Sequence, residues 1–115
     1  MTSQETLFSK IINREIPADI VYEDELCLAF RDINPQAPVH TLLIPKSPIT
    51  KLSESTAGDQ SLLGHMLIVA PKIAREEGYP DEFRLVINNG ESAGQTVFHL
   101  HIHILAGRAM HWPPG

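Results

Sequence analysis

His99-Leu100-His101-Ile102-His103-Ile104-Leu105 places three histidines at alternate positions, with aliphatic residues between them. Successive side chains of a β-strand point to opposite faces. The order therefore predicts a strand with three imidazoles on one face and an apolar face against the core. Helical spacing would scatter both sets around a cylinder, so we prefer the strand.

Three interpretations of this histidine row are open. It is a structural strand that happens to be rich in histidine, a metal site, or a catalytic site for phosphoryl transfer. Neighbouring histidines of a strand start about 6.7 Å apart and the outer two about 13 Å apart. One metal ion would therefore take two of them and need a ligand from elsewhere. In the catalytic interpretation a central imidazole attacks phosphorus while its neighbours donate hydrogen bonds or protonate the leaving group.

The composition is that of one ordinary soluble domain. The chain has 115 residues, 43% hydrophobic and 20% charged, with a formal net charge of −5. It shows no basic stripe, so we expect no nucleic-acid partner and no binding to an anionic membrane. A single cysteine, Cys27, rules out an internal disulfide and is expected to be a small core thiol. The polar stretch Met1–Glu5 lacks an apolar signal segment, so the cytoplasm is the expected compartment.

Periodicity and turn residues predict the elements between Thr6 and the tail. We expect helices over 6–14, capped by Thr6, and 61–77, and strands over 19–23, 26–31, 39–45, 83–88 and 97–106. Pro71 falls inside the longer helix, where it should kink the helix or split it in two.

Several single features have both a structural and a functional interpretation. Asp32 ends a strand, where it caps a turn or accepts hydrogen bonds from a ribose diol. His40 begins the strand over 39–45 and would lie near the histidine row if that strand is its neighbour. The small, polar loop 88–96 lacks the lysine of a Walker loop, yet its backbone N–H groups can approach an anion closely. Trp112 lies in a proline-rich tail and either folds back or inserts into a partner.

Taken together, these segments resemble the histidine triad (HIT) superfamily. The histidine strand, Asn88 with Gly94-Gln95 before it, the loop Asp32–Pro38 with His40, and the ending Met110–Gly115 are closest to its Hint branch, the nucleoside phosphoramidases. The resemblance covers nearly the whole chain from Thr6.

The resemblance implies an α+β fold, with a five-stranded antiparallel sheet, one long helix and one short helix. It also implies that the sheet extends across a homodimer. The chain would then be a single HIT domain over 1–115, with a core over 6–106 and a tail over 107–115 near the dimer partner.

The resemblance also implies the roles of individual residues. His101 matches the nucleophile, His103 a phosphate-contacting histidine, and His99 and His40 supporting members. Thr96, which replaces the serine of close eukaryotic relatives, keeps a hydroxyl for the leaving group. The implied nucleotide-binding residues are Asp32, Ile33, Phe30, Phe8, Leu7, Ile11, Asn88, Gly94, Gln95, Thr96, His101, His103 and Trp112.

The function implied is cleavage of the P–N bond of purine nucleoside 5′-phosphoramidates through a nucleotidyl-histidine intermediate. The ligand would be the phosphoramidate or the nucleoside monophosphate, and we expect neither a metal nor a cofactor. A non-catalytic nucleotide-binding or protein-interaction module would keep the same pocket and remains open at this point. A metal-binding protein is the third possibility.

Overall fold

A computed structural model describes residues 5–115, so most of the polar stretch Met1–Glu5 lies outside the described residues. The strands are β1 (Ile20–Glu23), β2 (Cys27–Arg31), β3 (Val39–Pro45), β4 (Arg84–Val86) and β5 (Ile102–Ala106). The helices are α1 (Leu7–Ile12) and α2 (Gln60–Glu76). Short 3₁₀ turns lie between β3 and α2, at η1 (Leu52–Glu54) and η2 (Ala57–Asp59), and between β4 and β5, at η3 (Glu91–Ala93). Among residues 5–115, no helix has the length and apolar character needed to span a membrane.

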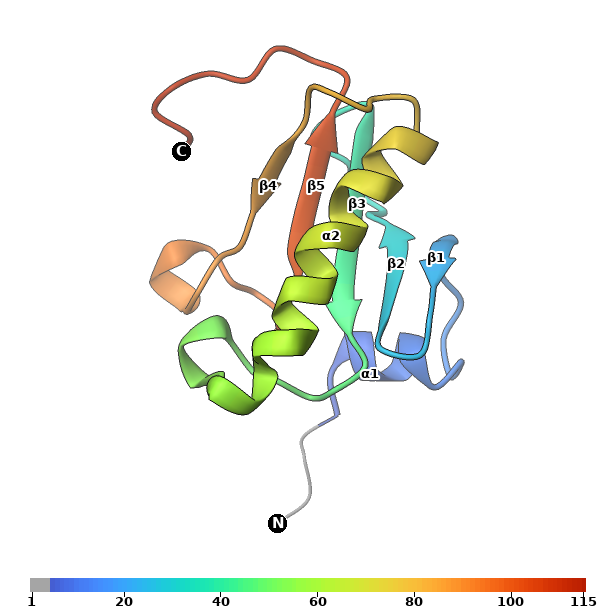
Figure 1. Cartoon of the computed structure of the whole chain (residues 1–115), viewed down its shortest axis with the longest axis vertical. Helices are drawn as coiled ribbons and strands as arrows, with labels where there is room; N and C mark the ends of the chain where they lie inside the picture. Colours follow the sequence, from blue (N-terminus) through green and yellow to red (C-terminus); the bar gives the residue numbers. More distant parts are fainter. Residues whose placement is uncertain (1–4) are drawn as a thin grey trace.

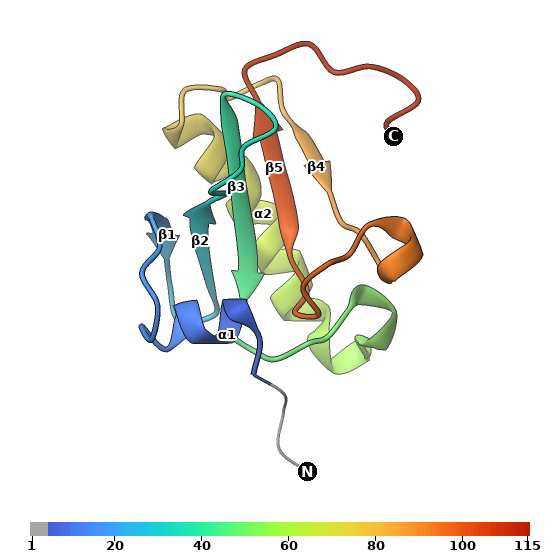
Figure 2. The same cartoon turned by 180° about the vertical axis from the view of Figure 1, so that it is seen from behind.

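The strands form one antiparallel sheet in the order β1-β2-β3-β5-β4, with β3 at its centre. α2 crosses one face of the sheet, and α1 lies at one end of the opposite face (Figure 1, Figure 2). This is the expected α+β fold, with one long and one short helix on a five-stranded antiparallel sheet.

Strand alternation divides the core into two layers. On the α2 side, Cys27 and Ala29 of β2, Leu43 of β3, and Ile102 and Ile104 of β5 pack with the buried face of the helix. On the α1 side, a second cluster combines Phe8, Ile11, Leu28, Phe30, Leu42 and Ile44. Because side chains alternate along each strand, residues with neighbouring numbers belong to different layers.

Thr6 caps α1, as the sequence predicts, and the helix runs from Leu7 to Ile12, shorter than the predicted 6–14. The Thr6 side chain accepts a hydrogen bond from the Ser9 backbone N–H at 3.1 Å, and the Ser9 hydroxyl accepts one from the Thr6 N–H at 2.8 Å. This reciprocal capping satisfies two backbone donors at the helix start. The helix places Phe8 and Ile11 against the sheet.

Pro71 does not split α2 in two. The helix is continuous from Gln60 to Glu76 with Pro71 inside it (Figure 1). Proline removes the bond that the Leu67 carbonyl would otherwise accept. Leu67 is 51% exposed, so this carbonyl belongs to the outer side of the helix, where water can replace the missing donor.

β5 is shorter than predicted and contains only one histidine of the row. It begins at Ile102 rather than at residue 97, so His99 and His101 precede it. The pairing of Leu43 with Ile102 would bring Pro45 opposite Leu100 if the ladder continued. Pro45 has no N–H to donate. The Leu100 N–H instead donates to the Ile49 carbonyl at 2.7 Å, and the segment leaves the sheet.

Candidate active site

A cavity of about 380 Å³ opens on the α1 side of the sheet, at the end where α1 and the histidine segment meet. Its walls come from α1 and the residues after it, β2 and its following loop, β3, and the segment from Thr96 to His103. The lining residues are Leu7, Phe8, Ile11, Ile16, Pro17, Ala18, Phe30, Arg31, Asp32, Ile33, Leu42, Thr96, Val97, His101 and His103. The volume falls in the range of small-molecule sites.

His101 is buried, with 5% of its surface exposed, and it lines this cavity. Its Nδ1 lies 2.8 Å from the His99 backbone carbonyl oxygen. A carbonyl can only accept, so Nδ1 carries the proton and donates it. In the neutral ring this leaves the lone pair on Nε2. Phe8 packs edge-on against the ring, with centroids 5.0 Å apart, and holds its orientation.

The hydrogen bond from His40 fixes the tautomer of His103. The Gln36 N–H donates to His40 Nδ1 at 3.0 Å, so that nitrogen is unprotonated and Nε2 carries the proton. His40 Nε2 lies 2.9 Å from His103 Nδ1 and donates to it. His103 therefore keeps its own proton on Nε2. The ring centroids of His101 and His103 are 4.9 Å apart. The Nε2–H donor of His103 therefore lies beside the ring that carries the His101 lone pair.

His99 completes the row without lining the cavity. Its Nε2 donates to the Pro45 carbonyl at 2.7 Å, and the side chain is buried against Phe8. Its backbone carbonyl is the acceptor that fixes His101. All three rings of the row thus lie on the α1 side, although only His103 belongs to β5.

Burial makes these imidazoles poor bases. It lowers the pKa of His40, His99 and His101 below the usual 6.5 and, with the neighbouring rings of His101 and His40, lowers the pKa of His103 to about 4. Removal from water disfavours the charged form. At pH 7 the rings are neutral, which keeps a lone pair on His101 for attack.

Asp32 and Ile33 lie at the mouth of the cavity. Asp32 Oδ1 accepts a hydrogen bond from the Asn34 N–H at 2.8 Å, while Oδ2 lies 3.5 Å from His40 Nε2. The second oxygen keeps a lone pair for a ligand. Ile33 is 98% exposed and projects at the rim. The apolar walls behind them are the predicted Leu7, Phe8, Ile11 and Phe30.

The loop 88–96 contributes less directly than expected. Only Thr96 of the four predicted residues there lines the cavity. Gln95 is buried, its amide oxygen accepts from the Gly90 N–H, and its two amide hydrogens go to the Thr50 and Val97 carbonyls. A contact between Gln95 and a phosphate would therefore not come from its amide hydrogens. Both donors are already used, and together they fix the entry to the histidine segment.

Asn88, Gly94 and Trp112 lie outside the cavity lining. Gly94 has φ +102°, and a Cβ there would meet the Asn88 amide at 3.4 Å, so the two residues lie side by side. Trp112 is 84% exposed in the tail. The tail is tied to the body by Arg84, which donates to the His111 carbonyl, and by Arg108, which donates to the Gln36 carbonyl.

Six lining residues were not predicted from the sequence, namely Ile16, Pro17, Ala18, Arg31, Leu42 and Val97. The sequence contained a signal that could have identified one of them. Leu42 shares the face of β3 with His40, because the two are separated by two positions. The segment 16–18 gave no such signal, since its place depends on how the chain turns after α1.

Two groups of three ligating side chains occur within residues 5–115, each with its donor atoms within 4.8 Å of one another. Asp32, His40 and His103 form one inside the site. A metal there would displace the hydrogen bond from His40 to His103. Asp24, Cys27 and His65 form the other, on the α2 side of the sheet.

Comparisons with known proteins identify the family of this chain. The family model of the HIT domain matches residues 13–110. An uncharacterized HIT-like protein of Synechocystis sp. is 65% identical, and the match covers 98% of this chain and 99% of that protein. A 14 kDa zinc-binding protein of Zea mays is 53% identical over 96% of this chain and 88% of its own length.

Solved structures agree in fold as well. The crystal structure of a HIT family hydrolase from Legionella pneumophila superposes with a TM-score of 0.94 and 49% identity, covering 96% of this chain and 100% of that one. A HIT family hydrolase from Clostridium thermocellum gives a TM-score of 0.91 and 45% identity, covering 96% of each chain. The chain therefore belongs to the HIT family.

Proposed function

We propose that this chain hydrolyses the P–N bond of purine nucleoside 5′-phosphoramidates, releasing the nucleoside monophosphate and an amine. One observation carries the proposal. The His99 carbonyl holds the proton of His101 on Nδ1, which turns the Nε2 lone pair into a nucleophile inside a nucleotide-sized cavity. The HIT family hydrolases that share the fold support the broader class of reaction.

In the first step His101 Nε2 attacks the phosphorus of the phosphoramidate. A new bond from Nε2 to phosphorus forms as the P–N bond to the amine breaks. The departing nitrogen keeps the bonding electron pair and takes a proton, which the Thr96 hydroxyl relays from solvent. The Nδ1 proton stays on the ring. The His99 carbonyl accepts a hydrogen bond from it and so stabilises the positive charge of the nucleotidyl-histidine.

In the second step water attacks the same phosphorus. The bond to Nε2 breaks, its electron pair returns to the ring, and the water loses a proton to solvent as the monophosphate forms. The Nε2–H of His103 donates to a phosphoryl oxygen through both steps, because His40 holds the other nitrogen as an acceptor. No metal ion takes part in this scheme.

The remaining cavity residues supply nucleoside binding in this proposal. The apolar wall of Leu7, Phe8, Ile11 and Phe30, with Ile33 at the rim, surrounds the base. The Asp32 carboxylate accepts hydrogen bonds from the ribose hydroxyls. In the same proposal the loop residues Asn88, Gly94, Gln95 and Thr96 contact the phosphate and its surroundings, and Thr96 is the one of them that lines the cavity.

A homodimer and a cytoplasmic location belong to the same proposal. β4 is an edge strand, and the tail extends outward beyond it (Figure 2). A partner pairing along β4 would continue the sheet, and Trp112 would then reach toward the partner's cavity.

The proposal is tested with His101→Ala and adenosine 5′-phosphoramidate. Turnover should fall by at least about a thousandfold, while the affinity for adenosine monophosphate changes little, because only the nucleophile is lost. The matched control is His65→Gln, a histidine on the other side of the sheet, which should keep normal turnover. Comparable turnover by His101→Ala would contradict the proposal. Tight nucleotide binding without turnover in the unaltered chain would favour a binding module.

A further inference from the structure

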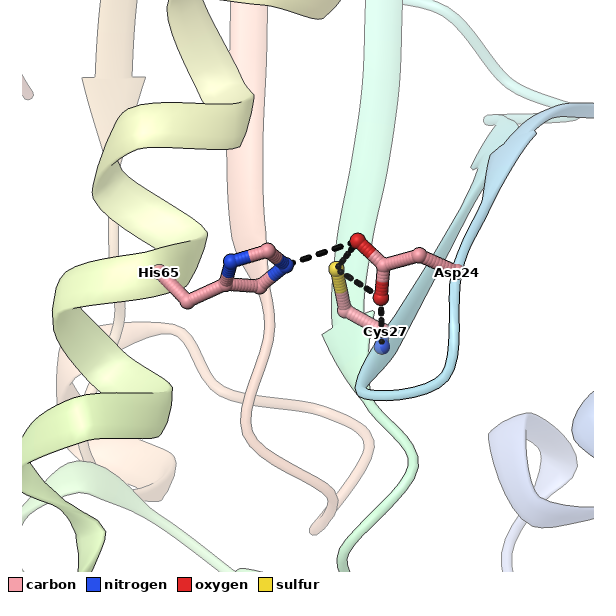
Figure 3. Close-up of side chains that lie close together, drawn as sticks. All are labelled: Asp24, Cys27 and His65. Carbon is pink, nitrogen blue, oxygen red and sulfur yellow. Dashed lines mark hydrogen bonds and ion pairs between the residues drawn. The ribbon is translucent and has the colours of Figure 1, made fainter.

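A second group of chemically active side chains lies on the sheet face opposite the cavity. Asp24 comes from the turn between β1 and β2, Cys27 begins β2, and His65 projects from α2 (Figure 3). The thiol of Cys27 belongs to the buried layer beneath α2. Two segments far apart in the sequence, the start of β2 with its preceding turn and α2, thus bring a sulfur, a nitrogen and a carboxylate together. The proposed reaction uses none of them.

The distances between these atoms approach those of a tetrahedral metal site. Cys27 Sγ lies 3.5 Å and 3.6 Å from the two oxygens of Asp24, and His65 Nε2 lies 2.7 Å from Asp24 Oδ2. The edges of a tetrahedron of zinc ligands are about 3.4 to 3.6 Å. A carboxylate that binds through one oxygen contributes one edge to sulfur, and this distance already matches. His65 would have to move outward by about 0.7 Å, and its side chain is 34% exposed, so it has room to move.

The carboxylate is held in place by groups that a metal would not displace. Asp24 Oδ1 accepts from the N–H groups of Leu26 and Cys27, at 2.8 and 2.9 Å, and Oδ2 accepts from the Tyr22 hydroxyl at 2.8 Å. Without a metal, His65 and Cys27 each direct a proton at this carboxylate. A cation in the same place would replace those two donors and leave the backbone contacts intact.

We propose that Asp24, Cys27 and His65 form a binding site for a divalent transition metal of the zinc class, with water as the fourth ligand. Sulfur, imidazole and carboxylate are donors that zinc and cobalt accept together. Cys27 binds as the thiolate and releases its proton to solvent. His65 binds through Nε2 and keeps its proton on Nδ1.

Two consequences follow from the surroundings of the site. The buried Cys27 thiol must lose its proton to bind the ion, so metal affinity should rise with pH. The ion would also join α2 to the start of β2. Because the site exists only in the folded chain, metal binding should stabilise the folded state.

Cobalt(II) offers a direct test, because a bound thiolate gives a cobalt charge-transfer absorption in the near ultraviolet. Cys27 is the only cysteine of the chain, so this band can arise only at the proposed site. We expect the band with the unaltered protein under reducing conditions, and its loss on adding zinc. Absence of the band at saturating cobalt would overturn the proposal.

Two variants identify the ligands. His65→Gln should weaken cobalt affinity by at least about a hundredfold, a larger loss than removal of an outer partner causes. His103→Gln, which removes a member of the other ligating group, should leave the band unchanged. A band that survives in His65→Gln with full affinity would overturn the assignment. Circular dichroism checks that each variant is folded, and zinc should raise the melting temperature of His103→Gln but not of His65→Gln.

Discussion

At the scale of single residues, His40 decides which nitrogen of His103 carries a proton. The His40→Asn variant removes the donor that lies 2.9 Å from His103 Nδ1 and frees that ring to change tautomer. We expect kcat to fall on the order of tenfold to a hundredfold and KM to change less, because the contacts to the base and the ribose are unaffected. Steady-state kinetics measures kcat and KM separately, and nitrogen-15 NMR of the imidazoles reports the tautomer of His103.

The neighbouring Thr41 provides the control for His40. Its hydroxyl is buried on the other side of β3 and finds no hydrogen-bond partner among residues 5–115. Thr41→Val should keep normal turnover, and its free energy of unfolding should stay equal or rise, since no bond is lost. Equal kinetic losses in His40→Asn and Thr41→Val would mean that the effect comes from strand packing and not from the His103 proton.

The sequence predicted the residues of the site better than their hydrogen bonds. Alternation placed His101 and His103 on one face and brought His40 beside them, as the structure has them. The role of Gln95 could not be predicted, because its partners Gly90, Thr50 and Val97 come together only when the loop closes. The tautomer of His101 likewise depends on a backbone carbonyl whose direction the residue order does not set.

At the scale of elements, Pro71 should destabilise α2 although it does not break it. Pro71→Ala restores a donor for the Leu67 carbonyl and the ordinary helix propensity. We expect the free energy of unfolding to rise by about 1 to 3 kcal/mol, measured by urea titration. Gly64→Ala in the same helix is the comparison. A Cβ there meets nothing within 4 Å, and the expected gain is about 0.5 to 1 kcal/mol.

A gain in Gly64→Ala with a loss in Pro71→Ala would contradict this account of the helix. It would mean that the proline ring is required in its packing. Of the two outcomes predicted for Pro71, a kink or a split, the split is excluded. The exposed side of α2 tolerates an unpaired carbonyl that a buried side would not.

The ends of the elements show what residue patterns cannot decide. β3 was predicted with its observed bounds because apolar residues run up to Pro45. β5 was predicted five residues too long, because its end depends on the register with β3. Only that register places Leu100 opposite a proline that cannot donate to the ladder.

At the scale of the whole molecule, the buried histidines make stability depend on pH. The unfolded rings bind protons near pH 6.5, while the folded rings bind them only at lower pH, to about 4 for His103. The unfolded state therefore holds more protons in this window, and stability should fall as the pH drops from 6.5 toward 4. His103 alone accounts for a loss of about 3 kcal/mol at full protonation.

Urea unfolding at a series of pH values measures this loss. The His103→Gln variant should lose less stability between pH 6.5 and 4 than the unaltered chain. The Asp24 and Glu23 carboxyls, whose pKa values the fold lowers, act mainly below this window, so they affect both proteins alike. Equal slopes in the two proteins would contradict the burial of a neutral His103.

The central claim is that His101 Nε2 attacks phosphorus, and trapping its adduct tests it most directly. Protein mixed with excess adenosine 5′-phosphoramidate is quenched within the first turnover at alkaline pH, where a bond between phosphorus and imidazole survives, and digested for mass spectrometry. The account predicts an adenylyl group on His101 that is lost in His101→Ala and kept in His65→Gln. Turnover with no adduct at any quench time, or an adduct on another residue, would contradict it.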